Sequence, residues 1–346
     1  MRAVTFREPG VVALAGVPVP RLEDAGDAIV RVTTAAICGS DLHFLHGKAP
    51  LEPGDVMGHE AVGVVEAVGG EVSRVAPGDR VVIAFDIACG RCWFCRRGET
   101  ALCEDFRMLG GGTFGGGLAG AQAERVRVPV ADVNLLGVPD LVEDDAAVFV
   151  GDVLSTAMHA AEVARISPDE TVAIVGAGPV GSLLVQAVGR SEPAGLFAID
   201  PRPERLAIAE RFGAEALDAT KVNPQTALFE RTDGRGADVV FEAVGSPAAF
   251  ERSLDVVRRG GRVVVVGMYA GETVEAQLGV WWARALDVRF TGICPVHAVW
   301  ERTMADVAAG RLDPAAVVSD RLSLDDAAEG YARFDRREAT KVLLLP

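Results

Sequence analysis

One stretch, residues 172–200, constrains the fold of this chain more than any other part of the sequence. It opens with the apolar run 172–175, which is followed by the turn Gly176-Ala177-Gly178-Pro179-Val180-Gly181. A helix-like segment comes next, and then a second apolar run that ends in Asp200. This order of strand, glycine turn, helix, strand and acid is typical of the βαβ unit that binds a dinucleotide. It predicts a parallel sheet of the α/β class.

Each glycine of the turn has a separate physical task in such a unit. Gly176 permits the tight turn, and Gly178 lets the backbone approach a pyrophosphate that rests on the N-terminal amides of the helix. Gly181 allows close packing of the helix on the strand. Asp200 follows Gly181 by 19 residues, which is the distance at which an acid binds the ribose 2′-hydroxyl.

The pattern of expected secondary structure changes near residue 150. Before it, short apolar runs recur between turns and predict a β-rich domain, with strands at 28–32, 63–68, 80–84 and 125–129. After it, strands alternate with helices, as in a Rossmann doubly wound parallel sheet. The further strands are expected at 238–241, 262–266 and 288–292, and the helices at 203–212 and 248–257, with Gly260-Gly261 as a helix end. The tail is expected to return to short strands, the last at 341–345.

Bulk properties exclude several classes of protein. The chain has 346 residues and a net charge of -15, which argues against a nucleic-acid surface. No run reaches the length of about 18 apolar residues that a membrane helix needs. The N-terminus lacks the apolar core of a signal peptide, so we expect a cytoplasmic protein with no membrane partner.

Four of the six cysteines, Cys89, Cys92, Cys95 and Cys103, crowd into one short segment. Two residues separate each of the first three, and seven separate the last pair. Four thiolates on a short lobe can close a tetrahedral shell around zinc with no open position, which makes such a site structural. The alternative is four unrelated buried cysteines.

A second group of possible metal ligands lies outside that lobe. It consists of Cys38 in the run Cys-Gly-Ser-Asp-Leu-His and of His59 in Gly-His-Glu. One thiolate and one imidazole are good zinc ligands, but a catalytic zinc needs a third protein ligand and an open fourth position. Spacing alone does not show that the two residues meet, and either can be an ordinary core residue.

The two cysteine motifs, the Gly-His-Glu run and the glycine turn occur together and in this order. In that combination the chain resembles the zinc-dependent alcohol dehydrogenases of the medium-chain dehydrogenase/reductase superfamily over essentially its whole length. The resemblance implies a GroES-like catalytic domain at 1–148 with a structural zinc lobe at about 88–105. It further implies a Rossmann NAD-binding domain at 149–292 and a return to the catalytic domain at 293–346.

The resemblance also assigns roles to individual residues of the first domain. Cys38 and His59 match the catalytic zinc ligands, and Glu60 matches a residue that either supports those ligands from behind or binds the metal as an alternative ligand. Ser40 and His43 match the proton relay of the family. Phe85 matches an aromatic residue of the substrate pocket, although an ordinary core phenylalanine is an equal alternative.

The third zinc ligand departs from the best-known members, which have a cysteine before the Rossmann domain. Asp152 occupies that position here, and a carboxylate oxygen is acceptable to zinc. The branch that resembles formaldehyde dehydrogenases uses an aspartate there, and residues 131–135 are also similar to that branch. The alternative is that Asp152 caps a helix and Glu60 binds the metal.

Asp200 favours NAD over NADP, because a 2′-phosphate would meet its carboxylate. Arg202 and Arg205 oppose this inference, since either can pair with a phosphate, although Arg205 also fits a family position seen with NAD. The cofactor-binding residues that the resemblance adds to the glycine turn are Thr156, Arg205, Val244, Val266 and Met268.

The predicted function is NAD-linked interconversion of an alcohol with an aldehyde or ketone, with two zinc ions per chain. A formaldehyde dehydrogenase or dismutase-like enzyme is the nearest alternative. A catalytically silent NAD-binding protein and a zinc-free reductase are others, but the surviving motifs weigh against both. The expected partners are the small-molecule substrate and further copies of the chain, as a homodimer or homotetramer.

Overall fold

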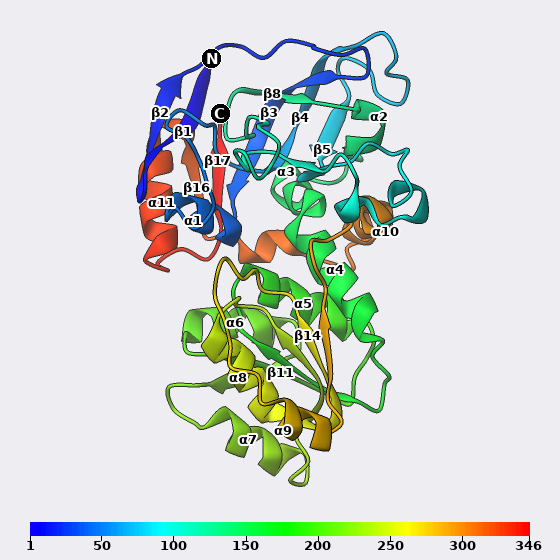
Figure 1. Ribbon diagram of the computed structural model, residues 1–346, viewed down its shortest axis with the longest axis vertical. Helices are drawn as coiled ribbons and strands as arrows, with labels where there is room; N and C mark the ends of the chain where they lie inside the picture. The colour runs from blue at the N-terminus through cyan, green and yellow to red at the C-terminus, as the bar shows by residue number, and fades with distance from the viewer. The chain divides into compact units, whose positions relative to one another are not determined.

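The computed structural model describes residues 1–346, and the chain divides into two compact units. The first unit contains residues 1–155 and 294–346, and the second contains residues 156–293. The first unit is therefore built from both ends of the chain, and Figure 1 shows blue and red strands within it.

A seven-stranded sheet is the framework of the first unit. Its order is β16-β17-β3-β4-β5-β9, and β8 also pairs with β3. A separate hairpin, β1-β2, and the short pair β6-β7 complete its β-structure. The strands of this unit are β1 Arg2–Glu8, β2 Val11–Gly16, β3 Ala28–Ile37, β4 Glu60–Val68, β5 Arg80–Ile83, β6 Asp86–Ile87, β7 Arg107–Met108, β8 Arg125–Val128, β9 Leu135–Gly137, β16 Asp320–Ser323 and β17 Val342–Leu345.

Helices in the first unit are mostly short. They are α1 Gly39–Leu45, α2 Ala131–Asn134, α3 Asp144–Ala147, α10 Val296–Ala308 and α11 Ala327–Asp335, with 3-10 turns η1 Cys95–Arg97, η2 Thr100–Leu102, η3 Val148–Gly151, η4 Pro314–Val317 and η5 Leu324–Asp326. No single helix of the chain is long and apolar enough to cross a membrane. One bent pair, 144–151 with 153–164, meets the length and composition criteria together.

The second unit is a six-stranded parallel sheet of order β12-β11-β10-β13-β14-β15. The chain runs outward from β10 to β12 and then restarts beside β10 at β13, so the strand order reverses there. A reversal of this kind defines the ligand-binding edge of a doubly wound sheet. The elements are β10 Thr171–Val175, β11 Gly195–Asp200, β12 Glu215–Asp218, β13 Ala237–Glu242, β14 Val257–Val265, β15 Asp287–Phe290, α5 Pro179–Gly189, α6 Pro203–Arg211, α7 Pro224–Arg231, α8 Pro247–Val256 and α9 Leu278–Ala283, with α4 Val153–Ala164 leading into the unit.

The α/β class with a parallel sheet and a β-rich N-terminal region is thus confirmed. Two local expectations are wrong. Gly260-Gly261 does not end a helix: the pair lies inside β14, where the register with β13 shifts, as glycines in a bulged strand do. The tail contains α10 and α11 as well as strands, because its apolar residues recur at a helical period that we did not assign.

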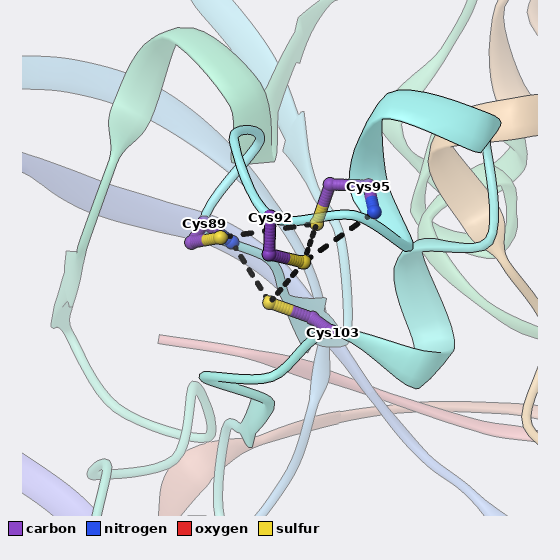
Figure 2. A group of neighbouring side chains, drawn as sticks. All are labelled: Cys89, Cys92, Cys95 and Cys103. Atoms are coloured by element: carbon purple, nitrogen blue, oxygen red, sulfur yellow. Dashed lines mark hydrogen bonds between the residues drawn. The ribbon is translucent and has the colours of Figure 1, made fainter.

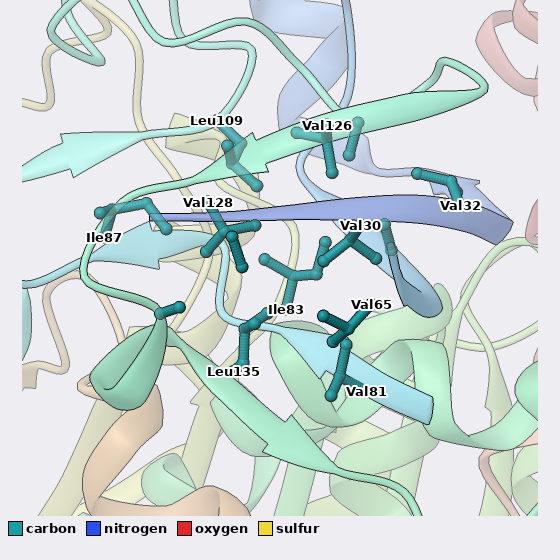
Figure 3. Close-up of a cluster of buried hydrophobic side chains, with 14 of the residues drawn as sticks. Val30, Val32, Val65, Val81, Ile83, Ile87, Leu109, Val126, Val128 and Leu135 are labelled. Atoms are coloured by element: carbon teal, nitrogen blue, oxygen red, sulfur yellow. The ribbon is translucent and has the colours of Figure 1, made fainter. Parts of the chain in front are cut away.

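Branched aliphatic side chains form the core of the first unit. Figure 3 shows Val30, Val81 and Ile83 meeting between the strands, and each is fully buried. Branched residues suit this position because their restricted χ1 angles match a pleated surface. This core holds β3, β4 and β5 in register, and those strands position the candidate metal ligands.

Truncation of this core should cost stability. Ile83→Ala removes three buried carbon atoms, and we expect it to lower the free energy of unfolding by about 2–5 kcal/mol. Leu141→Ala is the control, because Leu141 is 70% exposed and should change stability by no more than about 0.5 kcal/mol. Urea denaturation of both variants measures the difference, and equal losses would contradict this packing.

Candidate metal centres and nucleotide site

The register of two strands brings Cys38 and His59 together. β3 and β4 pair antiparallel with Ala36 opposite Glu60. Cys38 follows the end of β3 and His59 precedes the start of β4, so the two side chains meet at the same edge of the sheet. Cys38 also caps the N-terminus of α1. Both residues are buried.

Asp152 reaches the same edge from a distant part of the chain. It follows the 3-10 turn η3, whose Gly151 lies tightly against β5. A Cβ at Gly151 would lie 2.1 Å from the Ile83 carbonyl oxygen, so only glycine fits there. The Phe85 N–H donates to the Gly151 carbonyl at 3.0 Å. These backbone contacts fix the place of Asp152.

The three side chains have the spacing of metal ligands. Their ligand atoms all lie within 4.8 Å of one another. Asp152 Oδ2 is 3.7 Å from Cys38 Sγ and 3.3 Å from His59 Nε2. Tetrahedral zinc with ordinary bond lengths would separate such atoms by about 3.5 and 3.3 Å respectively. The donor set therefore fits zinc, with one coordination position left for another ligand.

Asp41 is a buried acid that contacts both His59 and Cys38. It lies within a quoted sequence motif, but we assigned it no role from the sequence. Asp41 Oδ1 lies 3.0 Å from His59 Nδ1, and Asp41 Oδ2 accepts the Cys38 N–H at 2.9 Å. Burial alone would lower the pKa of His59, but Asp41 and Asp152 raise it well above its usual value. Contact of Asp41 with Nδ1 leaves Nε2 as the nitrogen that faces the other ligands. Carboxylate contacts of this kind orient metal-bound histidines in general.

Glu60 is not among the three converging ligand residues and is held by a cation. The Lys341 ammonium donates to Glu60 Oε2 at 2.5 Å, and both side chains are fully buried. Burial raises the pKa of Glu60 to about 7, although Lys341 opposes the shift. Lys341 precedes β17, whose Val342 pairs with Ile37 of β3. The C-terminal strand thus supplies the counter-ion of this site, and no sequence motif marked it.

The residues expected at the proton relay and pocket lie around the triad to different extents. Ser40, on α1, has its Oγ 3.1 Å from His59 Nε2. The Phe85 ring is tilted at 60° to the His59 ring, with centroids 6.0 Å apart. His43 lies in the last turn of α1, half-buried. The structure therefore brings Ser40 and Phe85 to His59.

The four-cysteine lobe forms a second candidate metal centre. Figure 2 shows the four sulfur atoms converging on one point from the loop that carries η1 and η2. Sulfur separations are 3.4 Å for Cys92 and Cys95, 3.9 Å for Cys89 and Cys95, and 4.0 Å for Cys92 and Cys103. Zn–S bonds of about 2.3 Å give tetrahedral edges of about 3.8 Å. The spacing fits a closed tetrathiolate site and excludes disulfides.

Backbone amides donate to two sulfurs of the lobe and favour their thiolate forms, whereas burial raises the pKa of Cys95 and of Cys103. The Cys95 N–H donates to Cys92 Sγ at 3.5 Å and lowers the pKa of Cys92 to about 6. The N–H groups of Cys89 and Asp105 both donate to Cys103 Sγ at 3.3 Å. Hydrogen bonds of this kind stabilise thiolate ligands.

Both ends of the lobe attach to a buried polar cluster of Asn134, His297 and Thr100. Asn134 accepts the Ala88 N–H at 2.9 Å and donates to the Ala88 carbonyl at 3.0 Å, immediately before the first cysteine. His297 Nε2 lies 2.8 Å from Asn134 Oδ1, and Nδ1 lies 3.0 Å from the Thr100 hydroxyl. Since Asn134 Oδ1 can only accept, Nε2 carries the proton.

In the second unit, the glycine turn connects β10 to α5. Gly176 has φ +96°, in the region that favours glycine, and a Cβ on Gly181 would lie 1.8 Å from the Gly176 carbonyl oxygen. Gly178 caps α5, and a Cβ there would meet nothing closer than Arg205 Nη1 at 3.6 Å. The turn therefore leaves open space over the N-terminus of α5, where a pyrophosphate would fit.

Asp200 ends β11 beside this turn and is buried. Its Oδ2 accepts the Ala177 N–H at 2.8 Å and its Oδ1 accepts the Arg202 N–H at 2.9 Å. Each oxygen retains a free lone pair for a ribose hydroxyl. Asp200 thus also stabilises the glycine turn, a role that the spacing rule did not predict.

The other expected cofactor residues lie on several elements of the second unit. Thr156 belongs to α4, Val244 follows β13, and Val266 and Met268 follow β14. Val244 and Met268 are 49% and 40% exposed, so their side chains are accessible to a ligand. Glu242, which we did not assign, holds the β13 end in place by accepting the N–H groups of Val244 and Gly245.

Comparison with known proteins identifies the family. The profile of the "Alcohol dehydrogenase GroES-like domain" matches residues 24–140, and that of the "Zinc-binding dehydrogenase" matches residues 179–309. The chain belongs to the zinc-type alcohol dehydrogenase family of the medium-chain dehydrogenase/reductase superfamily. It is an oxidoreductase that acts on CH–OH donors, as the sequence predicted.

Individual relatives cover nearly the whole chain. A zinc-type alcohol dehydrogenase B of Aspergillus flavus is 36% identical over 99% of this chain and 81% of its own length. The solved alcohol dehydrogenase TADH from Thermus sp. ATN1 is 43% identical, with a TM-score of 0.94 over 100% of this chain and 99% of its own. A glutathione-independent formaldehyde dehydrogenase of Pseudomonas aeruginosa is 31% identical over 100% of this chain and 97% of its own length, so that branch is supported only weakly.

The buried cluster beside the cysteine lobe predicts a pH-dependent stability. Burial lowers the pKa of His297 to about 4, below the unfolded value of about 6.5. Because the unfolded chain takes up the proton first, the contribution of His297 is lost as the pH falls from 7 toward 4. Burial also raises the pKa of nearby Asp86, whose Oδ2 is 3.8 Å from His297 Nδ1.

We therefore expect the destabilisation caused by His297→Gln to shrink by about 2 kcal/mol between pH 7.5 and pH 5. Asp86 titrates in both proteins, so its effect largely cancels in the difference. Urea denaturation of the wild type and the variant at several pH values measures this. A difference that stays constant across the range would mean that His297 is not held neutral in the fold.

Proposed function

We propose that this enzyme interconverts an alcohol with an aldehyde or ketone, using NAD and a zinc ion held by Cys38, His59 and Asp152. The observation that supports the proposal most is the triad itself: a thiol, an imidazole and a carboxylate at zinc-ligand separations, buried at one edge of the sheet. Three protein ligands and one open position are typical of catalytic rather than structural zinc.

Different residues of the site would bind the zinc ion and move the substrate proton. A bound zinc would supply Lewis acidity to the substrate oxygen. Cys38 Sγ, His59 Nε2 and an Asp152 oxygen would hold it. The Ser40 hydroxyl, 3.1 Å from His59 Nε2, is placed to take the proton of the substrate hydroxyl and pass it toward His43 and solvent. A bound NAD would supply the acceptor for the hydride that leaves the substrate carbon.

We assign Glu60 a supporting role, because Lys341 already neutralises its carboxylate. Phe85, beside the His59 ring, is proposed to line the substrate pocket. Zinc in the four-cysteine lobe is proposed to be structural, since four thiolates leave no coordination position for a substrate.

Formaldehyde oxidation or dismutation is the second candidate. It is favoured by the Pseudomonas aeruginosa relative, which matches the full length of this chain at 31% identity. Asp152 at the third ligand position also resembles that branch. Turnover of formaldehyde without added NAD would favour a dismutase-like enzyme with tightly held cofactor over an ordinary alcohol dehydrogenase.

For the cofactor, we propose NAD bound over the glycine turn, with Asp200 on the adenosine ribose. Arg205, whose Nη1 is near Gly178, is proposed to contact the cofactor, together with Thr156, Val244, Val266 and Met268. The domain limits 1–148, 149–292 and 293–346 remain a proposal, as does the cytoplasmic location.

A homodimer is proposed through the free edge of β15. This strand ends the six-stranded sheet, and its Phe290 is 68% exposed, with Trp282 of the preceding helix 85% exposed. An open edge with large apolar side chains is a common site of association. A homotetramer is the alternative, and ultracentrifugation distinguishes the two.

Removal of the third ligand tests the zinc proposal. Asp152→Ala should lower the zinc content from two ions to one per chain and reduce kcat/KM by at least about 100-fold, more than loss of an outer contact costs. Cys38→Ser and His59→Ala should behave in the same way. The measurements are mass spectrometric zinc analysis and an NAD-linked assay on a panel of alcohols.

Cys92→Ala is the matched control for that experiment. It should remove the lobe zinc and lower thermal stability while the triad zinc remains. Full activity with two zinc ions in Asp152→Ala would refute the ligand assignment and favour Glu60 in its place.

The cofactor preference should depend on Asp200. The wild type is expected to have a higher kcat/KM with NAD than with NADP, because a 2′-phosphate would lie against this carboxylate. Asp200→Ser should shift the ratio toward NADP by at least about 10-fold, which corresponds to about 1.4 kcal/mol. Steady-state rates with both cofactors measure the ratio, and a wild type that prefers NADP would contradict the assignment.

A further inference from the structure

Two buried residues outside every motif extend the contacts of the triad. Gln122 precedes β8 in the chain and is fully buried, and Tyr331 of α11 is 1% exposed. Gln122 Nε2 donates to Asp41 Oδ2 at 3.3 Å and to the Ala36 carbonyl at 3.2 Å. The Tyr331 hydroxyl donates to Gln122 Oε1 at 2.8 Å. A continuous chain of contacts therefore runs from Tyr331 through Gln122 and Asp41 to His59.

The direction of each hydrogen bond follows from the groups at its ends. Ala36 and Asp41 offer only oxygen acceptors to Gln122, so the amide nitrogen must face them. The amide oxygen then faces Tyr331, whose hydroxyl must be the donor. Burial raises the pKa of Tyr331 well above its usual value, which keeps that proton in place. The orientation of the Gln122 amide is therefore fixed by its two acceptors.

A separate steric observation also connects Gln122 to His59. Gly58, directly before His59, has φ +89°, and a Cβ there would lie 2.3 Å from Gln122 Cγ. The backbone of this segment is held as well, since the Gln122 N–H donates to the Met57 carbonyl at 2.9 Å and the Ala121 N–H to the Gly58 carbonyl at 2.8 Å. Gln122 therefore packs directly on the backbone that carries His59.

We propose that Gln122 and Tyr331 are positioning residues for the catalytic metal site. Gln122 fixes the rotamer of Asp41, which in turn orients the His59 ring and the Cys38 backbone, and Tyr331 fixes the Gln122 amide. The inference rests on the proposed zinc triad. Outer contacts of this kind control metal affinity because they set the ligand geometry before the metal binds.

The test follows zinc release from the holoenzyme. A chelator is added in excess and the freed zinc is followed with time, and the kinetic phase that is absent in Asp152→Ala is assigned to the triad. Gln122→Met, which keeps the volume but loses the hydrogen bonds, should accelerate the triad phase by about 10-fold. Tyr331→Phe, which removes one hydroxyl, should accelerate it by roughly 3-fold, since it leaves the hydrogen bonds of Gln122 to Asp41 and Ala36 in place.

A second measurement is the geometry of the ligands around the metal. Cobalt(II) substituted for the triad zinc has a visible spectrum that depends on ligand geometry, and both variants should shift it. The double variant should resemble Gln122→Met alone, because the two substitutions interrupt the same chain of contacts. Tyr269→Phe is the matched control: it removes the hydroxyl of the only other tyrosine, which donates to the Ser246 carbonyl at 3.3 Å, and should leave both release phases unchanged.

The outcomes separate this inference from the proposed function. An unchanged triad phase and cobalt spectrum in both variants would overturn the positioning role while leaving the triad in place. Equal acceleration of the triad and lobe phases would also overturn it, because that indicates a general loss of stability. If Gln122→Met does not fold, Tyr331→Phe decides the matter alone. A wild type without any triad phase would refute the proposed function as well.

Discussion

The candidate metal site depends on the pairing of β3 with β4 and with β17. β4 places His59 and Glu60 beside the end of β3, and β17 places Lys341 there from the other side. The backbone ladder thus determines which side chains meet before any side-chain interaction is considered. Because a slip of one residue would turn each side chain to the opposite face, the valine-rich core between these strands is also what keeps the site together.

Burial of the charged side chains at this site makes their pairing necessary. Asp41, His59, Glu60 and Lys341 are all at most 1% exposed. A buried charge without a partner is costly, so each must be paired or neutralised. Lys341 balances Glu60, and Asp41 balances His59, which leaves Asp152 and Cys38 to face the open side. This pairing of charges determines which buried groups support the site and which face the metal.

The sequence predicted the sites whose residues are contiguous in the chain. It did not reveal residues that only the fold brings to a site from distant segments. The glycine turn and the four cysteines are contiguous, and their residue types and spacing carry the chemistry directly. Asp152 was reached only through a family resemblance, since nothing near it marks a ligand. Lys341 and His297 were missed altogether, because a buried lysine or histidine is recognisable only from the partners that the fold brings to it.

Asp41 and Gln122 show two further limits. Asp41 stood inside a motif that we quoted, but an acid at the start of a helix is also an ordinary capping residue, and only the contact with His59 separates the two roles. Gln122 follows the glycine-rich segment 110–120 and belongs to no motif. The one indirect signal was Gly58, whose positive φ and lack of a side chain are needed because Gln122 packs against it.

The site joins four segments that are far apart in the chain: 38–60, 122, 152 and 331–341. Its completion therefore requires residues 294–346 to return to the first unit after the whole second unit has been passed. Contacts of such long sequence separation carry a high cost in loop-closure entropy. The Tyr331–Gln122–Asp41 network and the Lys341–Glu60 pair are the contacts that form only at that stage. A metal site whose outer contacts come from the C-terminal segment is thus complete only when that segment is in place, and the cysteine lobe at 89–103 shares this dependence, because His297 of the same segment contacts both Thr100 and Asn134.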